Sequence, residues 1–206
     1  MKLFIILLLS LIANTAYSKE VRLELFTGTA FSLPSEVSVR QEGYPEVSKT
    51  ANWSTRPLEP APYYSARIGL WEEETGLEFE MLHHKLYMDN TDEVFRNYRS
   101  TFGFNFFLFN KAWQLENFIL RAGVGPIVSH PINNIRGQEY KSSVTYNLVG
   151  TGTQVAIQGR QKLYKKLYIT EEAKITYGFA NLPISGGDSS LTNTAFHILI
   201  GLGYSF

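Results

Sequence analysis

The final segment of the chain alternates in character from one residue to the next. Its large apolar residues occupy every second position, namely Phe196, Ile198, Ile200, Leu202, Tyr204 and Phe206. The positions between them hold small or polar residues apart from Leu199, and His197 is the ionisable side chain in this set. A period of two is the side-chain repeat of a β-strand, so the segment predicts a strand with one apolar face.

This strand carries its aromatic residues toward the carboxyl end, and it resembles the closing strand of a bacterial outer-membrane β-barrel. In such barrels the terminal aromatic residue helps the outer-membrane assembly machinery to recognise the chain. The resemblance implies the assembly machinery as a partner and the bacterial outer membrane as the location.

The amino-terminal residues have the pattern of a secretory signal. Lys2 precedes an apolar run from Leu3 to Ile12, and Ala16-Tyr17-Ser18 offers small residues where a signal peptidase cleaves. The run is shorter than the roughly 18 to 20 residues of a membrane-spanning helix. We expect residues 1–18 to be a cleaved signal peptide and residues 19–206 to form a single barrel domain.

The composition argues against several classes of function. The 19 Lys and Arg residues balance the 19 Asp and Glu residues, so no basic field points to a nucleic-acid partner. The chain has no cysteine, which excludes disulfides and thiol chemistry within it. Aromatic residues make up 14% of the chain, a share that suits the interfacial girdles of a membrane barrel.

Alternating segments of the length that a tilted membrane strand needs, about 9 to 12 residues, occur along the whole mature chain. We count eight of them, which start near Val21, Tyr63, Gly76, Tyr98, Phe118, Thr151, Leu167 and Ala195. An even number lets an antiparallel sheet close without exposed edges. The prediction is an all-β fold: a closed, eight-stranded antiparallel transmembrane β-barrel with an interior filled by polar side chains.

The connections between these segments alternate in length. The long ones span Ser32 to Pro62, Asp89 to Asn97, His130 to Gly150 and Ala180 to Thr194, and the others are shorter. Long outer loops and short periplasmic turns are typical of outer-membrane barrels, so we expect both termini in the periplasm. The connection at 32–62 is rich in proline, serine and glutamate, and a lid, a binding surface and a mobile tether remain open for it.

Alternation also separates two faces. On the fourth segment, one face is made of Phe102, Phe104, Phe106 and Leu108, and the opposite face is made of Thr101, Gly103 and Asn105. The polar residues expected inside elsewhere are Arg22, Glu24, Arg121, Gln154, Gln158, Arg160, Glu172 and Lys174. An eight-stranded barrel has room only for side chains, so these charges predict a paired network rather than a water-filled pore. Glu171 falls on the lipid face, near the periplasmic edge unless a bulge shifts the register.

The four histidines, His83, His84, His130 and His197, all fall at the outer end of such a barrel. Imidazole is a common metal ligand and a general base near neutral pH. A metal site built from His83, His130 and His197 would bring their nitrogens to within about 4 to 5 Å of each other. His83 and His84 are adjacent and point to opposite faces, so one of the two can join His197.

Two polar residues, Glu80 and Asn105, are inward candidates to complete a site with the histidines. The alternative is that they belong to the interior network and that the histidines are merely tolerated at the interface. A catalytic serine is harder to build, because Ser129 and His130 are neighbours that point apart in an extended strand.

Several segments together resemble the bacterial lipid A oxidase-like outer-membrane proteins. They are 62–67, 80–87, 102–105, 121–126, 129–131 and 172–174. The resemblance implies oxygen-dependent, metal-assisted oxidation of the glucosamine unit of lipid A, with a divalent metal such as iron. By matching positions it implies roles for His83, Lys85, Asn105, His130 and Glu172. The family has proline before the histidine at the end of the fifth strand, whereas Ser129 precedes His130 here.

Two classes of function therefore stand. The first is an enzyme of the outer leaflet that modifies lipid A. The second is a non-enzymatic barrel that braces the membrane or whose loops bind lipopolysaccharide or a surface partner. In both classes we expect outer-membrane lipids and lipopolysaccharide as partners.

Overall fold

A computed structural model describes residues 20–142 and 146–206, without the side chains of residues 101 and 102. The expected signal peptide, 1–18, lies outside the described residues. The strands are β1 (Glu20–Ser32), β2 (Ser35–Gln41), β3 (Val47–Ala51), β4 (Trp53–Ser54), β5 (Tyr64–Glu72), β6 (Thr75–Met88), β7 (Phe95–Leu115), β8 (Phe118–Ser129), β9 (Ile132–Ile135), β10 (Gln138–Lys141), β11 (Asn147–Tyr164), β12 (Leu167–Ile184) and β13 (Gly187–Ser205).

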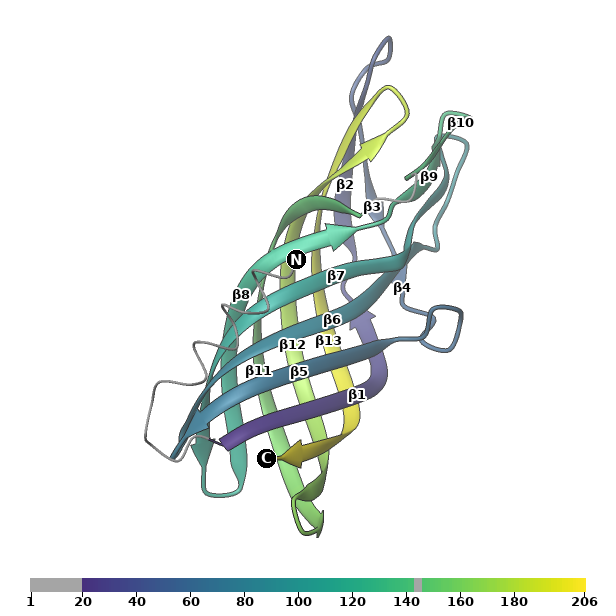
Figure 1. Ribbon diagram of the computed structural model, residues 1–206. Coiled ribbons are helices and arrows are strands. Elements are labelled where there is room, and N and C mark those ends of the chain that lie inside the picture. The colour runs from purple at the N-terminus through teal and green to yellow at the C-terminus, as the bar shows by residue number, and fades with distance from the viewer. Residues whose placement is uncertain (1–19, 143–145) are drawn as a thin grey trace.

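Eight of these strands form a closed antiparallel ring, as the sequence predicts. The ring runs β1–β5–β6–β7–β8–β11–β12–β13, and β13 pairs with β1 to complete it. The closing pair extends from Arg22 opposite Ser205 to Ser32 opposite Ala195. Figure 1 shows the tilted ring, with the carboxyl end and the start of β1 at its lower end.

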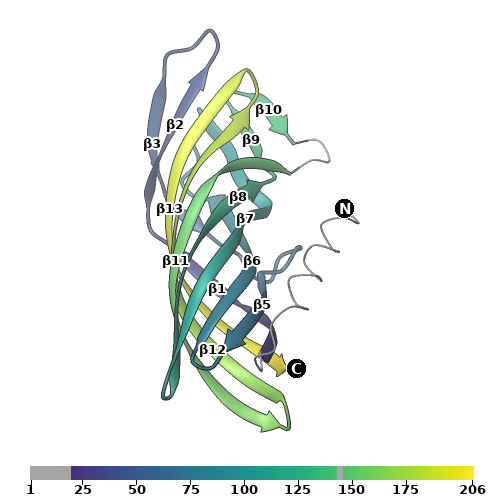
Figure 2. The same ribbon diagram turned by 60° about the vertical axis from the view of Figure 1, so that its left-hand side comes forward.

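The upper end is built differently from the expectation of long loops. Within the segment 32–62, β2 and β3 form a hairpin that pairs with β13, and β4 pairs with β6. Within 130–150, β9 and β10 form a hairpin that pairs with β7. The segment 180–194 mostly continues β12 and β13. These segments form β-structure because the strands of the ring extend beyond it, and their backbone N–H and C=O groups need hydrogen-bond partners there. Figure 2 shows both hairpins extending the barrel upward.

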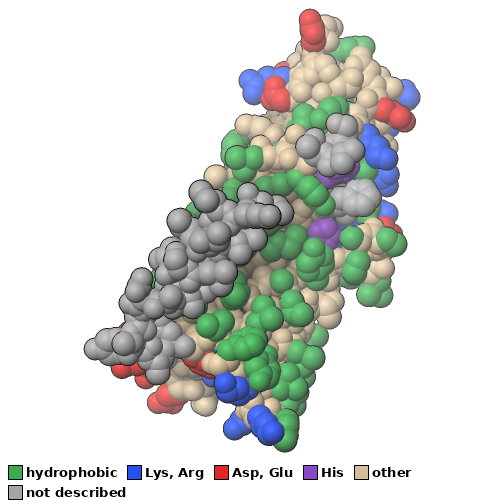
Figure 3. All heavy atoms as spheres, in the orientation of Figure 1, with side chains coloured by type: hydrophobic (Ala, Val, Ile, Leu, Met, Phe, Trp, Pro, Cys, Tyr) green, Lys and Arg blue, Asp and Glu red, His purple; other side chains and the backbone are tan. Residues whose placement is uncertain are grey.

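The outer surface carries an apolar belt. The alternate residues of β13 face outward as predicted, with Ile198 58% exposed, and β7 contributes Phe109 at 65%. Green side chains cover the middle of the molecule in Figure 3. Glu171 is exposed on the outer face beside Gly159, as the alternation predicts. Within the described ranges no helix is long and apolar enough to cross a membrane.

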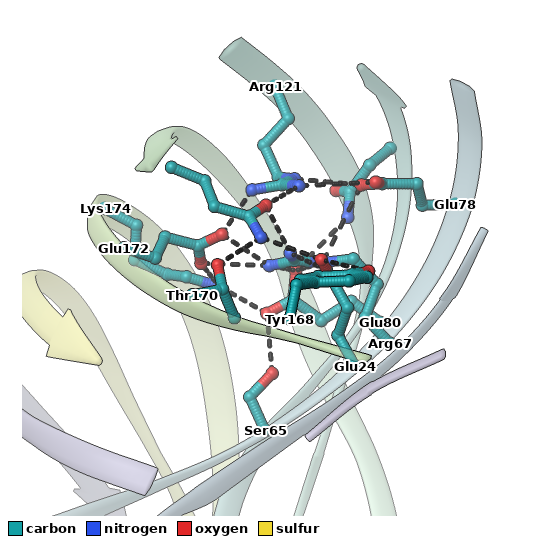
Figure 4. A network of polar contacts seen from close by, with 12 residues as sticks. Glu24, Ser65, Arg67, Glu78, Glu80, Arg121, Tyr168, Thr170, Glu172 and Lys174 are labelled. Carbon is teal, nitrogen blue, oxygen red and sulfur yellow. Dashed lines mark hydrogen bonds and ion pairs between the residues drawn. The ribbon is translucent and has the colours of Figure 1, made fainter. Parts of the chain in front are cut away.

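The lower half of the interior is a network of ion pairs centred on Arg67. Its guanidinium lies 2.8 Å from Glu24, 3.0 Å from Glu80 and 2.8 Å from Glu172. Two further cations complete the network: Arg121 contacts Glu78 and Glu172, and Lys174 contacts Glu80 and Glu172. Figure 4 shows these side chains converging from different strands. The predicted paired interior is therefore present at this level.

One residue expected in that network lies outside it. The side chain of Arg160 is exposed, and its guanidinium sits 4.9 Å from the centroid of the Tyr168 ring. Arg160 has the parity of an inward residue, but it lies so near the lower mouth of the barrel that solvent reaches it.

The upper half of the interior adds an apolar core to the predicted polar filling, which continues there in buried residues such as Ser189 and Asn193. Phe104, Phe106 and Leu108 are fully buried and belong to one apolar core. That core continues upward to residues such as Val39 of the β2–β3 hairpin and Ile135 of the β9–β10 hairpin. The face of β7 that carries Phe104, Phe106 and Leu108 therefore points into the barrel at this level, where it joins the apolar core that reaches up into the hairpins.

A filled barrel should not conduct ions. We expect the purified protein, inserted into planar lipid bilayers, to give no stepwise current, because charged side chains below and apolar side chains above occupy its interior. An open porin measured in the same bilayers is the positive control. Reproducible current steps from the pure protein would contradict the closed interior.

The network predicts a large effect of removing its central cation. Replacing Arg67 with alanine leaves buried carboxylates without their partner, and we expect the free energy of unfolding to fall by about 3 to 5 kcal/mol. Urea unfolding of the lipid-reconstituted protein, followed by tryptophan fluorescence, measures this change. The matched control is Arg40→Ala, which breaks the exposed pair with Asp188 and should cost less than about 1 kcal/mol. Equal losses for the two variants would show that the network contributes no special stability.

Candidate functional site

The barrel wall divides the six candidate residues into two groups. His84, His197 and Glu80 point into the barrel, where all three are fully buried. His83 and Asn105 have the outward parity of their strands, although both are buried, and His130 lies just beyond the end of β8. The division follows from the two-residue repeat of the strands, because adjacent residues such as His83 and His84 must face opposite ways.

The inner group centres on two imidazoles. The rings of His84 and His197 lie edge to face, with centroids 5.2 Å apart. The two nitrogens of His197 are hydrogen-bonded to the hydroxyls of Tyr63, at 2.6 Å, and Thr176, at 2.8 Å. His84 Nε2 lies 3.2 Å from Asn193 Oδ1, and its Nδ1 has no hydrogen-bond partner in the described part of the chain.

Both side chains of this inner pair are fully buried. Phe104 and Phe106 pack against the ring of His84, at centroid distances of 6.5 and 6.4 Å, and belong to the apolar core above. Glu80 lies in the ion-pair network, where Arg67, Lys174 and Ser65 contact its carboxylate. The inner group therefore links the polar lower half to the apolar upper half, enclosed by the barrel itself.

The outer group begins with a pair that the strand register creates. His83 on β6 stands directly opposite Asn105 on β7, and His83 Nδ1 lies 2.7 Å from Asn105 Oδ1. Asn105 thus faces outward, which corrects the expected inward position. The reason is the reversed face of β7: Phe104 on one side of it and Phe106 on the other fill the interior, so Asn105 between them must point out.

This pair leaves one imidazole nitrogen for chemistry. If Nδ1 of His83 donates its proton to the amide oxygen of Asn105, Nε2 carries the lone pair. That Nε2 atom is buried and has no hydrogen-bond partner among the residues described. The ring of Tyr64 stacks on the ring of His83, with centroids 5.0 Å apart, and Tyr64 is itself 39% exposed. An imidazole that is held in orientation by a hydrogen bond to an amide, with its other nitrogen unprotonated, is arranged to act as a general base.

Lys85, for which the resemblance implies a functional role, is engaged in structural hydrogen bonds. It lies at an irregularity in the β6–β7 pairing, between His84 and Leu86. Its ammonium group donates hydrogen bonds to the backbone oxygens of Arg56 and Glu59, at 3.0 and 2.9 Å. Lys85 therefore ties the 55–62 connection to the upper rim of the barrel.

His130 lies just beyond the end of β8. Its backbone N–H donates to the oxygen of Gly103, at 3.4 Å, and its ring meets the ring of Tyr146 edge to face, at 6.1 Å. Burial lowers the pKa of His130, and the positive charge of Lys141 lowers it further. Both effects favour the neutral imidazole.

The geometry does not fit the predicted metal site of His83, His130 and His197. His83 and His197 lie on opposite sides of the barrel wall, so His83, His130 and His197 do not converge on one ion. Across residues 20–142 and 146–206, no group of three His, Cys, Asp or Glu side chains is placed to hold a metal. Glu172, also implied by the resemblance, is engaged by Arg67 inside the barrel.

Four residues of these two groups escaped the sequence analysis: Tyr63, Tyr64, Thr176 and Asn193. Tyr64 could have been found, because alternation along β5 puts it on the outward face with Ile68, and it pairs with His83 on β6. Asn193 could not, because it falls in a segment that was expected to be a loop.

No protein-family model and no curated protein sequence matches the chain. Among solved structures it resembles the attachment invasion locus protein Ail of Yersinia pestis, with a TM-score of 0.44, 10% identity, and coverage of 92% of this chain and 99% of that one. It resembles the outer membrane protein OprG from Pseudomonas aeruginosa with a TM-score of 0.43, 10% identity, and coverage of 92% and 96%. For the outer membrane protease OmpT from Escherichia coli the values are 0.44, 10%, 94% and 99%. Likenesses of this size carry no argument about function, and the fold assignment rests on the strand pairings.

Proposed function

We propose that the protein is an integral outer-membrane barrel that modifies the lipid A of the outer leaflet, with His83 as its general base. The closed ring and its apolar belt support the membrane location, since only a closed barrel lets strands cross a bilayer with every backbone group paired. The tight turns at the lower end and the extended hairpins at the upper end support a periplasmic lower end.

The observation that carries the proposal is the position of the His83–Asn105 pair on the lipid side of the wall. Below His83 on the same face of β6 lie Leu77 and Phe79, which are exposed members of the apolar belt. Above it, Lys85 and the 55–62 connection begin the polar rim. A group at this boundary meets the headgroup and the ester linkages of outer-leaflet glycolipid, which is why lipid A is the proposed substrate.

The proposed chemistry is hydrolysis by acid–base catalysis. Nε2 of His83 accepts a proton from a water molecule, and the oxygen of that water attacks the carbonyl carbon of an ester of the lipid. The bond between that carbon and the ester oxygen then breaks, Nε2 returns the proton to the departing oxygen as a hydroxyl, and the acyl chain leaves as a carboxylic acid. Asn105 holds the ring through Nδ1 and is a positioning residue. Tyr64 covers the ring, and its partly exposed side chain must swing aside to admit the lipid. A general base of this kind contributes about 10²-fold to 10⁴-fold in rate.

A second function is favoured by a different observation. The hairpins β2–β3 and β9–β10 are held by an apolar core, with Val37, Val39 and Ile135 fully buried. A packed core makes the upper end a rigid projection, which suits a non-enzymatic barrel that binds lipopolysaccharide or a surface partner. This function needs no contribution from His83.

Lipid A mass spectrometry tests the enzymatic proposal. We expect cells that make the protein to contain a lipid A species that has lost an ester-linked group, and cells that make His83→Gln to lack it. The matched control is His130→Gln, which changes another outward histidine and should retain at least about a tenth of the product, since His130 is not the base. A product that gains one oxygen atom, or one that persists with His83→Gln, would contradict the proposal.

Asn105 is tested separately because it acts through His83. With purified enzyme and lipid A in mixed micelles, Asn105→Ala should lower kcat by about tenfold or more and leave KM nearly unchanged, because it frees the ring without altering lipid contacts. Asn105→Gln, which keeps an amide, should recover part of the loss. A variant that changes KM alone would mean that Asn105 contacts the lipid and does not orient the ring.

A further inference from the structure

The lower end of the barrel has an uneven distribution of charge. Its turns at Glu72–Glu74 and Glu116 are acidic and exposed. The β11–β12 hairpin instead carries four cations within seven residues: Arg160, Lys162, Lys165 and Lys166. In Figure 3, Lys and Arg side chains gather at the lower tip, where Figure 1 draws this hairpin.

These cations surround a cavity of about 470 Å³. Its lining includes Arg160, Lys162, Lys165, Lys166, Glu20 and Tyr168. Glu20 is the acidic side chain of this lining, and it is already paired with Arg22 at 2.7 Å. The cavity is therefore positively charged.

The lysines have little compensation from the protein. Arg160 lies over the Tyr168 ring, and Lys165 lies over the Tyr164 ring at 5.1 Å from its centroid. Among the residues that the structure describes, no ion pair involves Lys162, Lys165 or Lys166. Three exposed lysines that line one cavity and form no ion pair favour an anion bound among them.

Apolar side chains of the same hairpin, together with Phe206 of the cavity lining, mark a membrane interface. Tyr164 is 66% exposed and Phe206 is 62% exposed, and Leu163 is exposed beside them. Aromatic residues at the end of an apolar belt mark the level of the lipid headgroups. The anions at that level are the phosphates of glycerophospholipids.

A second hollow gives such a lipid a place for its acyl chain. It has a volume of about 350 Å³ on the outer face, and Phe118, Ile169 and Ile200 line it. Arg160 lines both hollows, so they adjoin. Gly159 deepens the outer one by leaving out a side chain, and Glu171 at its edge contributes one opposing charge.

We propose that the β11–β12 hairpin is a binding site for an anionic glycerophospholipid, such as phosphatidylglycerol, of the periplasmic leaflet. The phosphate lies among Lys162, Lys165 and Lys166, and an acyl chain lies in the groove beside Phe118. The site rests on the proposed orientation, with the lower end in the periplasm, and is independent of any chemistry at His83.

Electron paramagnetic resonance with spin-labelled lipids tests the site. The full-length protein is reconstituted in phosphatidylcholine bilayers, and the association of labelled phosphatidylglycerol is compared with that of labelled phosphatidylcholine. We expect a preference for phosphatidylglycerol that falls by about fivefold or more in the variant Lys162→Gln/Lys165→Gln/Lys166→Gln, given that one lysine near a charged lipid surface changes binding by about that factor. The preference should also weaken as salt is raised.

The matched control removes the same charge from the upper projection, with Arg40→Gln/Lys49→Gln/Arg96→Gln, and should keep the preference. Thermal unfolding of each variant verifies folding. Three outcomes would overturn the proposal: no preference in the wild type, an equal preference in the triple lysine variant, or an equal loss in the control. Binding of soluble anionic peptidoglycan fragments without a preference for phosphatidylglycerol would also overturn it. Loss of lipid A chemistry in His83→Gln leaves these results unchanged, so the two proposals fail separately.

Discussion

Closure of the eight-stranded ring is the constraint on which the rest of the structure depends. In hydrocarbon an unpaired backbone N–H or C=O is costly, so each strand must pair on both sides, and the pairing of β13 with β1 removes the last edge. Closure also fixes which face of each strand points into the barrel and which points out. One set of alternate side chains meets lipid, and the other set is confined to a narrow interior, where charges survive only when they are paired.

The interior meets that demand with two different fillings. Below, Arg67 gathers Glu24, Glu80 and Glu172 from three strands into one network. Above, apolar side chains fill a region that extends into the hairpins beyond the membrane belt. His84 and His197 lie where the two fillings meet, and hydroxyl and amide partners satisfy three of their four ring nitrogens. The same wall that encloses them holds His83 on its lipid side, which is why the outer pair is the candidate for chemistry.

Much of this architecture could be predicted because alternation is a local signal. The number of ring strands, the outward face of β13 and the inward positions of His197 and Glu80 are confirmed. Of the two alternatives left open for Glu80, its contacts with Arg67 and Lys174 favour the interior network. The prediction was wrong for Asn105, because the fourth segment offers a choice between two faces and parity alone does not say which one points in. That choice depended on the hairpins above, whose strands are held by pairing with β13 and β7, contacts that lie far from the fourth segment or outside its own repeat.

The sequence by itself determined the class of fold, the count of ring strands and the separation of His83 from His84, because a period of two is a property of each strand alone. Only the tertiary structure decided which histidine joined His197, where Asn105 pointed and how the lysines of the β11–β12 hairpin came to surround one cavity. These outcomes depend on register between strands and on packing across the barrel, which bring together residues such as Arg67 and Glu172 that are far apart along the chain. Spacing within a single strand carries no information about such contacts.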